Sequence, residues 1–390
     1  MMKIISLVVS AAVAPASAAS AAVASVPPDV LRAAGEVRWT PDRVAHLIGA
    51  TPKVETHLHL DGVPSAEMIR QFAVSQNYAP LASMSVAEIK ALYVVDRPRA
   101  SLPDVLAAFE TAYPVLRAPD AVQAMAYQAA AAASRQQVRY LEARFAPILQ
   151  AAEGFTSEQA LLAAFRGLSS GEQDFGVRSG VIVCLIRGLV REKNARMIDL
   201  AIKYKNHGVV GIDLAGNEAA QPLSDFKDLF RRAKAAGLKL TAHAGEVPDS
   251  RDIETALQIG VDRLGHATLL AGRPDLLEKV VARRTPIEVN LTSNLRTGAI
   301  ERIADHPAKA WHAAGAPITL STDDPGVFGI DLNGEYALLA SELGFAPADI
   351  LTVVFNGVDA LFLPRASKEN LRESFRRELI QILARLKAEP

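Results

Sequence analysis

The 390-residue sequence contains a single cysteine, Cys184, so it cannot form a disulfide bond within the chain. One thiol also excludes every metal site that needs several cysteines. Basic and acidic residues number 42 and 43, which gives a net charge of −1, and no long run of either sign occurs. Nucleic acid is therefore not an expected partner, because neutralising its phosphates requires clustered lysine and arginine.

The N-terminus carries an apolar run that is too short to span a membrane. A lysine follows the first two methionines, residues 4–14 form a short, mainly apolar run, and small residues follow, with possible cleavage sites at 16–18 and 23–25. This is the layout of a secretory signal peptide, whereas a membrane anchor needs roughly 20 apolar residues. We expect residues 1–24 to be removed on export, leaving a periplasmic or secreted protein without stable membrane insertion.

The rest of the chain predicts a leader region with helices over residues 25–50 and one α/β domain over 51–390. Short apolar runs alternate with patterns of helical period from residue 53 onward. Eight runs are candidate strands, at residues 54–59, 138–145, 180–186, 209–214, 239–243, 263–266, 287–291 and 318–322. Strands separated by helices pair in parallel, and eight such units predict a closed (β/α)8 barrel of the TIM type. A doubly wound open sheet is the alternative.

The first two candidate strands are separated by a long insertion, residues 60–137, and further helical patterns follow the last strand. The insertion contains helical patterns at 66–72, 87–93 and 121–133. An insertion after a barrel strand lies on the face where active sites form, so these helices are either a substrate lid or structural packing.

Four of the eight histidines lie at or near the ends of candidate strands. His57 and His59 are two positions apart, so both side chains lie on one face of a strand. His243 and His266 end the fifth and sixth strands, and Asp323 follows the eighth. Each alone has an ordinary explanation, such as a packed histidine or a turn aspartate.

Their combination points to a metal centre. Barrel enzymes carry their catalytic residues at the C-terminal ends of several strands. His57, His59, His243 and Asp323 form a set of nitrogen and oxygen ligands that suits zinc and leaves room for a water molecule.

Five segments together resemble the signature motifs of the adenosine deaminase family. They are Pro-Lys-Val-Glu-Thr-His-Leu-His-Leu-Asp-Gly (52–62), Gly-Ile-Asp-Leu-Ala-Gly-Asn-Glu (211–218), Thr-Ala-His-Ala-Gly-Glu (241–246), Leu-Gly-His (264–266) and Ser-Thr-Asp-Asp-Pro (321–325). Residues 140–145 and 292–294 fit as well, and the similarity extends from residue 52 to the C-terminal helices. The resemblance implies one zinc ion per chain, held by the four ligands above.

The resemblance also implies a role for each of several other residues. Glu246 matches the acid that protonates purine N1, and His266 matches the group that takes a proton from the zinc-bound water. Asp324 matches the carboxylate that orients this water and bonds N7. Such chemistry needs a strong nucleophile at neutral pH, and zinc supplies one by lowering the pKa of bound water from about 15.7 toward 7.

The resemblance also implies which residues contact the substrate. His59 lies beside the substrate as well as binding the metal, the backbone of Gly216 matches the contact to N3, and Asp61 matches the group that bonds the ribose 5′-hydroxyl. Ala267 departs from the pattern, since family members often have glycine there, and its methyl group would crowd the site. The implied reaction converts adenosine or 2′-deoxyadenosine into inosine, or 2′-deoxyinosine, and ammonia.

Three other functions stay open at this stage. The substrate could be another 6-aminopurine, such as adenine or a modified adenosine. Related barrels hydrolyse amides or phosphotriesters with two metals bridged by a modified lysine, but residues 213–216 at the end of the fourth strand contain no lysine. A secreted nucleoside-binding protein without catalysis would not need an acid and a base such as Glu246 and His266.

Overall fold

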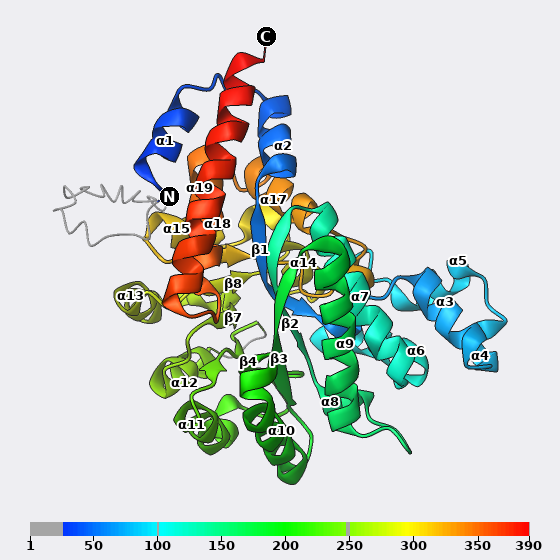
Figure 1. Ribbon diagram of the computed structural model, residues 1–390. Coiled ribbons are helices and arrows are strands. Elements are labelled where there is room, and N and C mark those ends of the chain that lie inside the picture. The colour runs from blue at the N-terminus through cyan, green and yellow to red at the C-terminus, as the bar shows by residue number, and fades with distance from the viewer. Residues whose placement is uncertain (1–25, 100, 247–249, 390) are drawn as a thin grey trace, which may run out of the picture.

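The computed structural model describes residues 26–99, 101–246 and 250–389 (Figure 1). The expected signal peptide, residues 1–24, lies outside the described residues. Two helices, α1 (Pro28–Gly35) and α2 (Pro41–Ala50), come before the first strand. Thr40 caps α2 by accepting a hydrogen bond from the backbone nitrogen of Arg43, and a proline occupies the first turn of each helix.

Every segment that was expected to form a strand contains one. The strands are β1 (Lys53–His59), β2 (Val138–Phe145), β3 (Arg178–Ile186), β4 (Val209–Ala215), β5 (Lys239–Leu240), β6 (His243–Ala244), β7 (Leu264–His266), β8 (Ile287–Val289) and β9 (Ile318–Leu320). The fifth expected strand is therefore divided into the short strands β5 and β6. All pairs are parallel.

The strands pair in chain order, which confirms the barrel and rules out the doubly wound alternative. One sheet runs β1-β2-β3-β4-β5 and the other β6-β7-β8-β9. A doubly wound sheet would reverse its strand order part-way. The first and last strands meet after β9, where the backbone nitrogen of His59 donates to Asp323 O at 2.8 Å and that of Asp323 donates to His57 O at 3.0 Å.

Helices follow the strands and surround them. Those of the insertion are α3 (Ala66–Ser75), α4 (Ala79–Ala82), α5 (Val86–Tyr93), α6 (Leu102–Leu116) and α7 (Pro119–Arg135). Those of the barrel are α8 (Pro147–Gln150), α9 (Ser157–Phe175), α10 (Arg191–Tyr204), α11 (Lys227–Ala235), α12 (Arg251–Ile259), α13 (Pro274–Arg283), α14 (Leu291–Arg296) and α15 (Ala308–Ala313). The C-terminal helices are α16 (Pro325–Phe328), α17 (Leu332–Ser341), α18 (Pro347–Ala360) and α19 (Arg365–Ala388).

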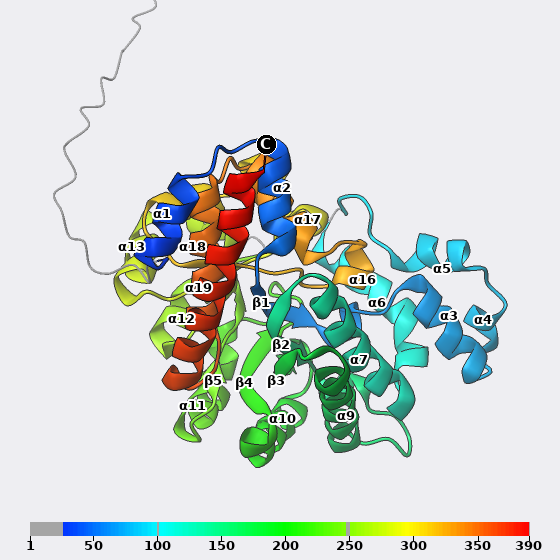
Figure 2. The same ribbon diagram turned by 45° about the horizontal axis from the view of Figure 1, so that its top comes forward.

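The two ends of the described chain pack together, away from the insertion. Helix α19 lies beside α1 and α2 in both ribbon views, and α3, α4 and α5 stand out from the barrel on another side (Figures 1 and 2). Among the described residues, none of the helices is long and apolar enough to cross a membrane.

The inside of the barrel carries charge as well as apolar side chains. Arg144 on β2 and Arg263 before β7 are fully buried, as are Glu142 on β2 and Glu288 on β8. Each of these groups is ion-paired, as a charge removed from water must be. This network lies directly below the strand ends where the site forms.

Candidate active site

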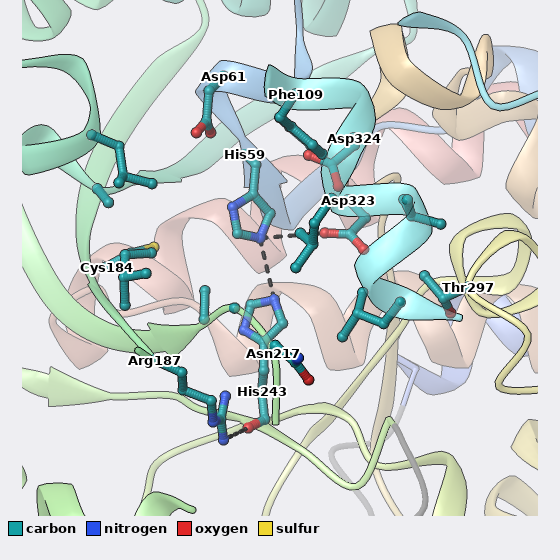
Figure 3. Close-up of a pocket in the computed structure, with 18 of the residues that line it drawn as sticks. His59, Asp61, Phe109, Cys184, Arg187, Asn217, His243, Thr297, Asp323 and Asp324 are labelled. Atoms are coloured by element: carbon teal, nitrogen blue, oxygen red, sulfur yellow. Dashed lines mark hydrogen bonds and ion pairs between the residues drawn. The ribbon is translucent and has the colours of Figure 1, made fainter. Parts of the chain in front are cut away.

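The C-terminal ends of the parallel strands bring the four expected metal ligands together. His57 and His59 come from β1, His243 from β6, and Asp323 from the segment after β9. Their ligand atoms all lie within 4.8 Å of one another. In Figure 3 the rings of His59 and His243 face each other, with Asp323 beside them.

Two buried carboxylates fix the orientation of two of these imidazoles. His57 Nδ1 lies 2.7 Å from Glu288 Oε2, and His243 Nδ1 lies 3.0 Å from Asp213 Oδ2. A carboxylate at Nδ1 keeps the proton on that nitrogen, so the Nε2 lone pair of each ring is directed toward the cluster.

The ring nitrogens and the carboxylate oxygen that face into the cluster are all hydrogen-bond acceptors, and they lie close to one another. His57 Nε2 is 3.0 Å from Asp323 Oδ1, and neither atom has a hydrogen-bond partner among the described residues. His59 Nε2 is 3.2 Å from His243 Nε2. Lone pairs held this close repel each other unless a cation lies between them. Three imidazole nitrogens and one carboxylate oxygen are also a donor set typical of zinc, so these residues fit a metal ion.

The charge state of Asp323 agrees with a ligand role. Burial acts to raise its pKa, but the imidazoles of His57, His266 and His59 outweigh burial and hold this pKa well below its ordinary value. Ser293 also donates a hydrogen bond to Asp323 Oδ2 at 2.7 Å. Asp323 is therefore ionised at neutral pH.

One arginine connects both supporting carboxylates. Arg144 Nη1 lies 3.0 Å from Asp213 Oδ2, and its Nη2 lies 2.9 Å from Glu288 Oε2. The same Nη2 donates to the carbonyl oxygen of Thr56 at 2.8 Å, next to His57. Arg144 thus balances the charge of the two groups that orient His57 and His243.

The expected acid, Glu246, lies at the wall of the same site. Burial, reinforced by the nearby charge of Asp323, raises the pKa of Glu246 to about 8, so it holds a proton at neutral pH. Its backbone nitrogen donates to Glu218 Oε2 at 3.0 Å, and that of Gly245 donates to Glu218 Oε1 at 2.8 Å. The side chain of Glu218 therefore holds the turn that carries Glu246.

His266 and Asp324 complete the expected set. His266 Nε2 lies 3.7 Å from Glu246 Oε2 and 3.8 Å from Asp323 Oδ2, and burial lowers the pKa of His266 well below its ordinary value. Burial, together with the charge of Asp323, raises the pKa of Asp324 well above its ordinary value.

These side chains border a cavity of about 290 Å³, a size near the lower end for small-molecule sites. Gly216, with φ +93°, and Asn217 line it after β4, and Asp61 lines it after β1. Helix α6 covers it with apolar side chains that include Phe109 (Figure 3). The insertion therefore forms part of the cavity wall.

Three positions at the site have strained backbone. His266 has φ +59°, Ala267 has φ +54° and Asp323 has φ +64°, a region that side chains other than glycine rarely adopt. This conformation explains why glycine suits position 267. The Ala267 side chain is buried, and it is not among the described residues that line the cavity.

Several residues of the site were not expected from sequence. Helix α6 was missed, and with it Phe109 and Tyr113, whose hydroxyl donates to Asp61 Oδ2 at 3.1 Å. The spacing of Leu102, Val105, Phe109 and Leu116 carries a helical signal that Pro103 and Pro114 obscure. Arg144 and Glu288 could have been noticed as charges inside otherwise apolar strands.

Comparison with known proteins identifies the family to which this site belongs. The family model described as adenosine deaminase matches residues 52–377. The chain belongs to the adenosine deaminase family. It is an enzyme, and the adenosine deaminase of Lacticaseibacillus paracasei is 35% identical to it over 326 residues, which cover 84% of this chain and 96% of that protein.

Solved structures of similar fold include other members of the same superfamily of metal-dependent hydrolases. An amidohydrolase of Burkholderia ambifaria, with bound zinc, has a TM-score of 0.81 and 26% identity, covering 90% of this chain and 96% of its own. The adenine deaminase of Arthrobacter aurescens has a TM-score of 0.78 and 27% identity, covering 84% and 99%. This adenosine deaminase family member therefore shares its barrel with enzymes of differing substrates.

Proposed function

We propose that this enzyme hydrolyses the 6-amino group of adenosine and 2′-deoxyadenosine, releasing ammonia, with one zinc ion held by His57, His59, His243 and Asp323. The observation that carries the proposal is the cluster of inward-facing ligand atoms beside a protonated Glu246. The zinc in the related Burkholderia ambifaria structure supports the choice of metal. When bound, zinc would supply an activated water molecule at neutral pH.

Glu246 provides the proton that the reaction needs. Attack at C6 breaks the conjugation of the purine ring and moves electron density to N1. A carboxyl group with a pKa of about 8 is protonated at neutral pH and donates to N1 as that charge develops. Glu218 keeps Glu246 in place through the backbone of the turn.

The rest of the cavity binds the purine. The backbone of Gly216 faces the cavity and donates to N3, and Asp324, directly after Asp323, bonds N7. The apolar side chains of α6 cover the base and exclude water from the reacting carbon.

Asp61 favours a nucleoside over a nucleotide. Tyr113 donates to Asp61 Oδ2, while Asp61 Oδ1 is buried without a hydrogen-bond partner among the described residues. A free carboxylate oxygen accepts a hydrogen bond from a ribose 5′-hydroxyl and repels a 5′-phosphate. Burial raises the pKa of Asp61 to about 6, which leaves it largely ionised at neutral pH. Free adenine, the substrate of the similar Arthrobacter aurescens enzyme, would leave this group unpaired.

We also propose that the enzyme acts outside the cytoplasm. The support is the pattern of residues 1–24, with a positive start, an apolar run and small residues that match a cleavable export signal.

The proposed reaction is tested by following the ultraviolet absorbance of adenosine with purified protein. Activity should be lost on treatment with a chelator and return with one equivalent of zinc per chain. His243→Ala should lose both the metal and the activity. Zinc-loaded protein that leaves adenosine and 2′-deoxyadenosine unchanged would contradict the proposal. Faster turnover of adenine or AMP would show that the substrate is another 6-aminopurine.

A further inference from the structure

A chain of hydrogen bonds leads from the protein backbone to His266. The backbone nitrogen of Ala308 donates to His306 Nδ1 at 3.1 Å. His306 Nε2 lies 3.2 Å from Asn294 Oδ1, and Asn294 Nδ2 lies 3.0 Å from His266 Nδ1. His306, Asn294 and His266 are all buried, so each link is shielded from competing water.

The direction of this chain is set at its backbone end. An amide N–H can only donate, so His306 Nδ1 must be an acceptor. Burial lowers the pKa of His306 to about 3, so the ring is neutral and its one proton lies on Nε2. His306 then donates to Asn294 Oδ1, which turns the NH2 group of Asn294 toward His266.

The last link determines where His266 holds its proton. Nδ1 accepts from Asn294, so Nδ1 carries no hydrogen and the ring proton lies on Nε2. The opposite side of the ring agrees, because Nε2 lies 3.8 Å from Oδ2 of the ionised Asp323, an oxygen that can only accept a hydrogen bond. His57 and His243 have the reverse arrangement, with their protons on Nδ1.

One neighbour favours the other tautomer. The amide of Asn290, oriented so that its nitrogen donates to Val289 O at 3.1 Å and Ser321 O at 3.2 Å, places its oxygen at the contact 3.3 Å from His266 Nδ1. This contact is longer than that of Asn294. Both amides are held by further hydrogen bonds, so the distance decides, and the shorter contact, that of Asn294, determines the tautomer.

We propose that Asn294 and His306 are positioning residues that hold His266 as the Nε2–H tautomer, so that His266 donates a hydrogen bond to the oxygen attacking the substrate and does not remove its proton. The proposal rests on the deamination reaction proposed above and specifies the role of one residue in it. The Nε2–H group points to the space between Glu246 and Asp323, beside the cavity. A histidine that removed a proton would need a lone pair there instead.

The tautomer can be read directly from nitrogen NMR of zinc-loaded protein with 15N-labelled histidine. The two tautomers give different one-bond and long-range proton–nitrogen patterns, and loss of one set of signals in His266→Gln assigns the residue. His57 and His243 serve as internal references for the Nδ1–H state. We expect His266 as Nε2–H, and an Nδ1–H signature in wild-type protein would overturn the proposal. This measurement requires no turnover, so its failure is separate from failure of the proposed reaction.

A variant tests the link to catalysis. Asn294→Asp places a carboxylate acceptor beside Nδ1 and should draw the proton to that nitrogen. In serine proteases an exchange that imposes the wrong histidine tautomer lowers kcat about 10⁴-fold, and we expect a fall in kcat of about 10²–10⁴-fold here, with zinc content and KM little changed. Asn194→Asp is the matched control, because Asn194 is a buried amide whose side chain bonds the backbone of Ile186 and is not part of the hydrogen-bond chain to His266.

The outcomes separate tautomer control from a general structural effect. Asn194→Asp should leave the His266 signature as in wild type. If Asn294→Asp loses activity but keeps the Nε2–H signature, the positioning role is wrong. If it shows Nδ1–H and keeps its kcat, His266 is not needed as a donor. Should Asn294→Asp fail to fold, the wild-type spectrum still decides the tautomer.

Discussion

Replacing Arg144 by methionine should destabilise the protein strongly, although the side chain does not line the cavity. Arg144 is fully buried and lies within 3.0 Å of Asp213 Oδ2 and 2.9 Å of Glu288 Oε2. Methionine has a similar volume and no charge, so the variant removes the pairing while filling the space. The carboxylates of Asp213 and Glu288 then lose their shared arginine while they stay fully buried.

The expected loss of stability in Arg144→Met depends on which partners Asp213 and Glu288 keep. Glu288 keeps its ion pair with Arg263, whereas Asp213 loses its arginine and keeps the hydrogen bond from the imidazole of His243. Removing one partner of a buried pair typically costs about 3–5 kcal/mol. With one carboxylate still compensated, we expect Arg144→Met to lower the free energy of unfolding by about 3 kcal/mol, a large part of the 5–15 kcal/mol typical of a folded protein.

Urea unfolding of metal-free protein at neutral pH measures this change. Adding Asp213→Asn removes the uncompensated charge, so the double variant should be more stable than the sum of the single effects by about 1–3 kcal/mol. Arg365→Met is the control, since Arg365 pairs with Glu369 on the surface of α19 and should change stability by less than about 1 kcal/mol. An Arg144→Met protein as stable as wild type would refute this account of the network.

Three further predictions concern the active site and export. Glu246→Gln should retain zinc and lower kcat by about 10²–10⁴-fold, because an amide cannot donate the proton. In wild type the protonated form is the active one, so kcat/KM should fall as pH rises through about 8, and a rate that rises across this range would contradict the role. Asp61→Ala should keep zinc but lose most of the preference for adenosine over 5′-deoxyadenosine, measured as the ratio of kcat/KM values. The exported protein should begin at a residue between 19 and 27, as determined by N-terminal sequencing, and an intact first methionine would refute cleavage.

The strands and the metal ligands could be predicted because their signals are local. An apolar run that ends in a histidine or an aspartate is visible within a few residues, as at His266 and Asp323. In a parallel barrel all such ends point the same way, so the topology itself brings them together. The barrel was therefore sufficient to predict the cluster of four ligands.

The supporting residues could not be predicted from local patterns because each acts across the barrel. Glu288 orients His57 from a strand on the other side of the closure, and His306 orients His266 through Asn294. These pairs are set by strand register and side-chain direction, which the sequence does not display. Helix α6 was missed for a different reason, since Pro103 and Pro114 interrupt the pattern that its buried residues would otherwise show.

The backbone pairing of β1 with the segment after β9, which closes the barrel, has a consequence for how the enzyme acquires its metal. The backbone bonds that close the barrel belong to His57, His59 and Asp323, which are three of the four proposed ligands. Neither half of the ring can assemble the complete ligand set, so a nascent or partly threaded chain has no finished site to fill. We therefore expect the metal site to be complete only once the barrel has closed, and a chain exported in an unfolded state would take up its ion in the compartment where it folds.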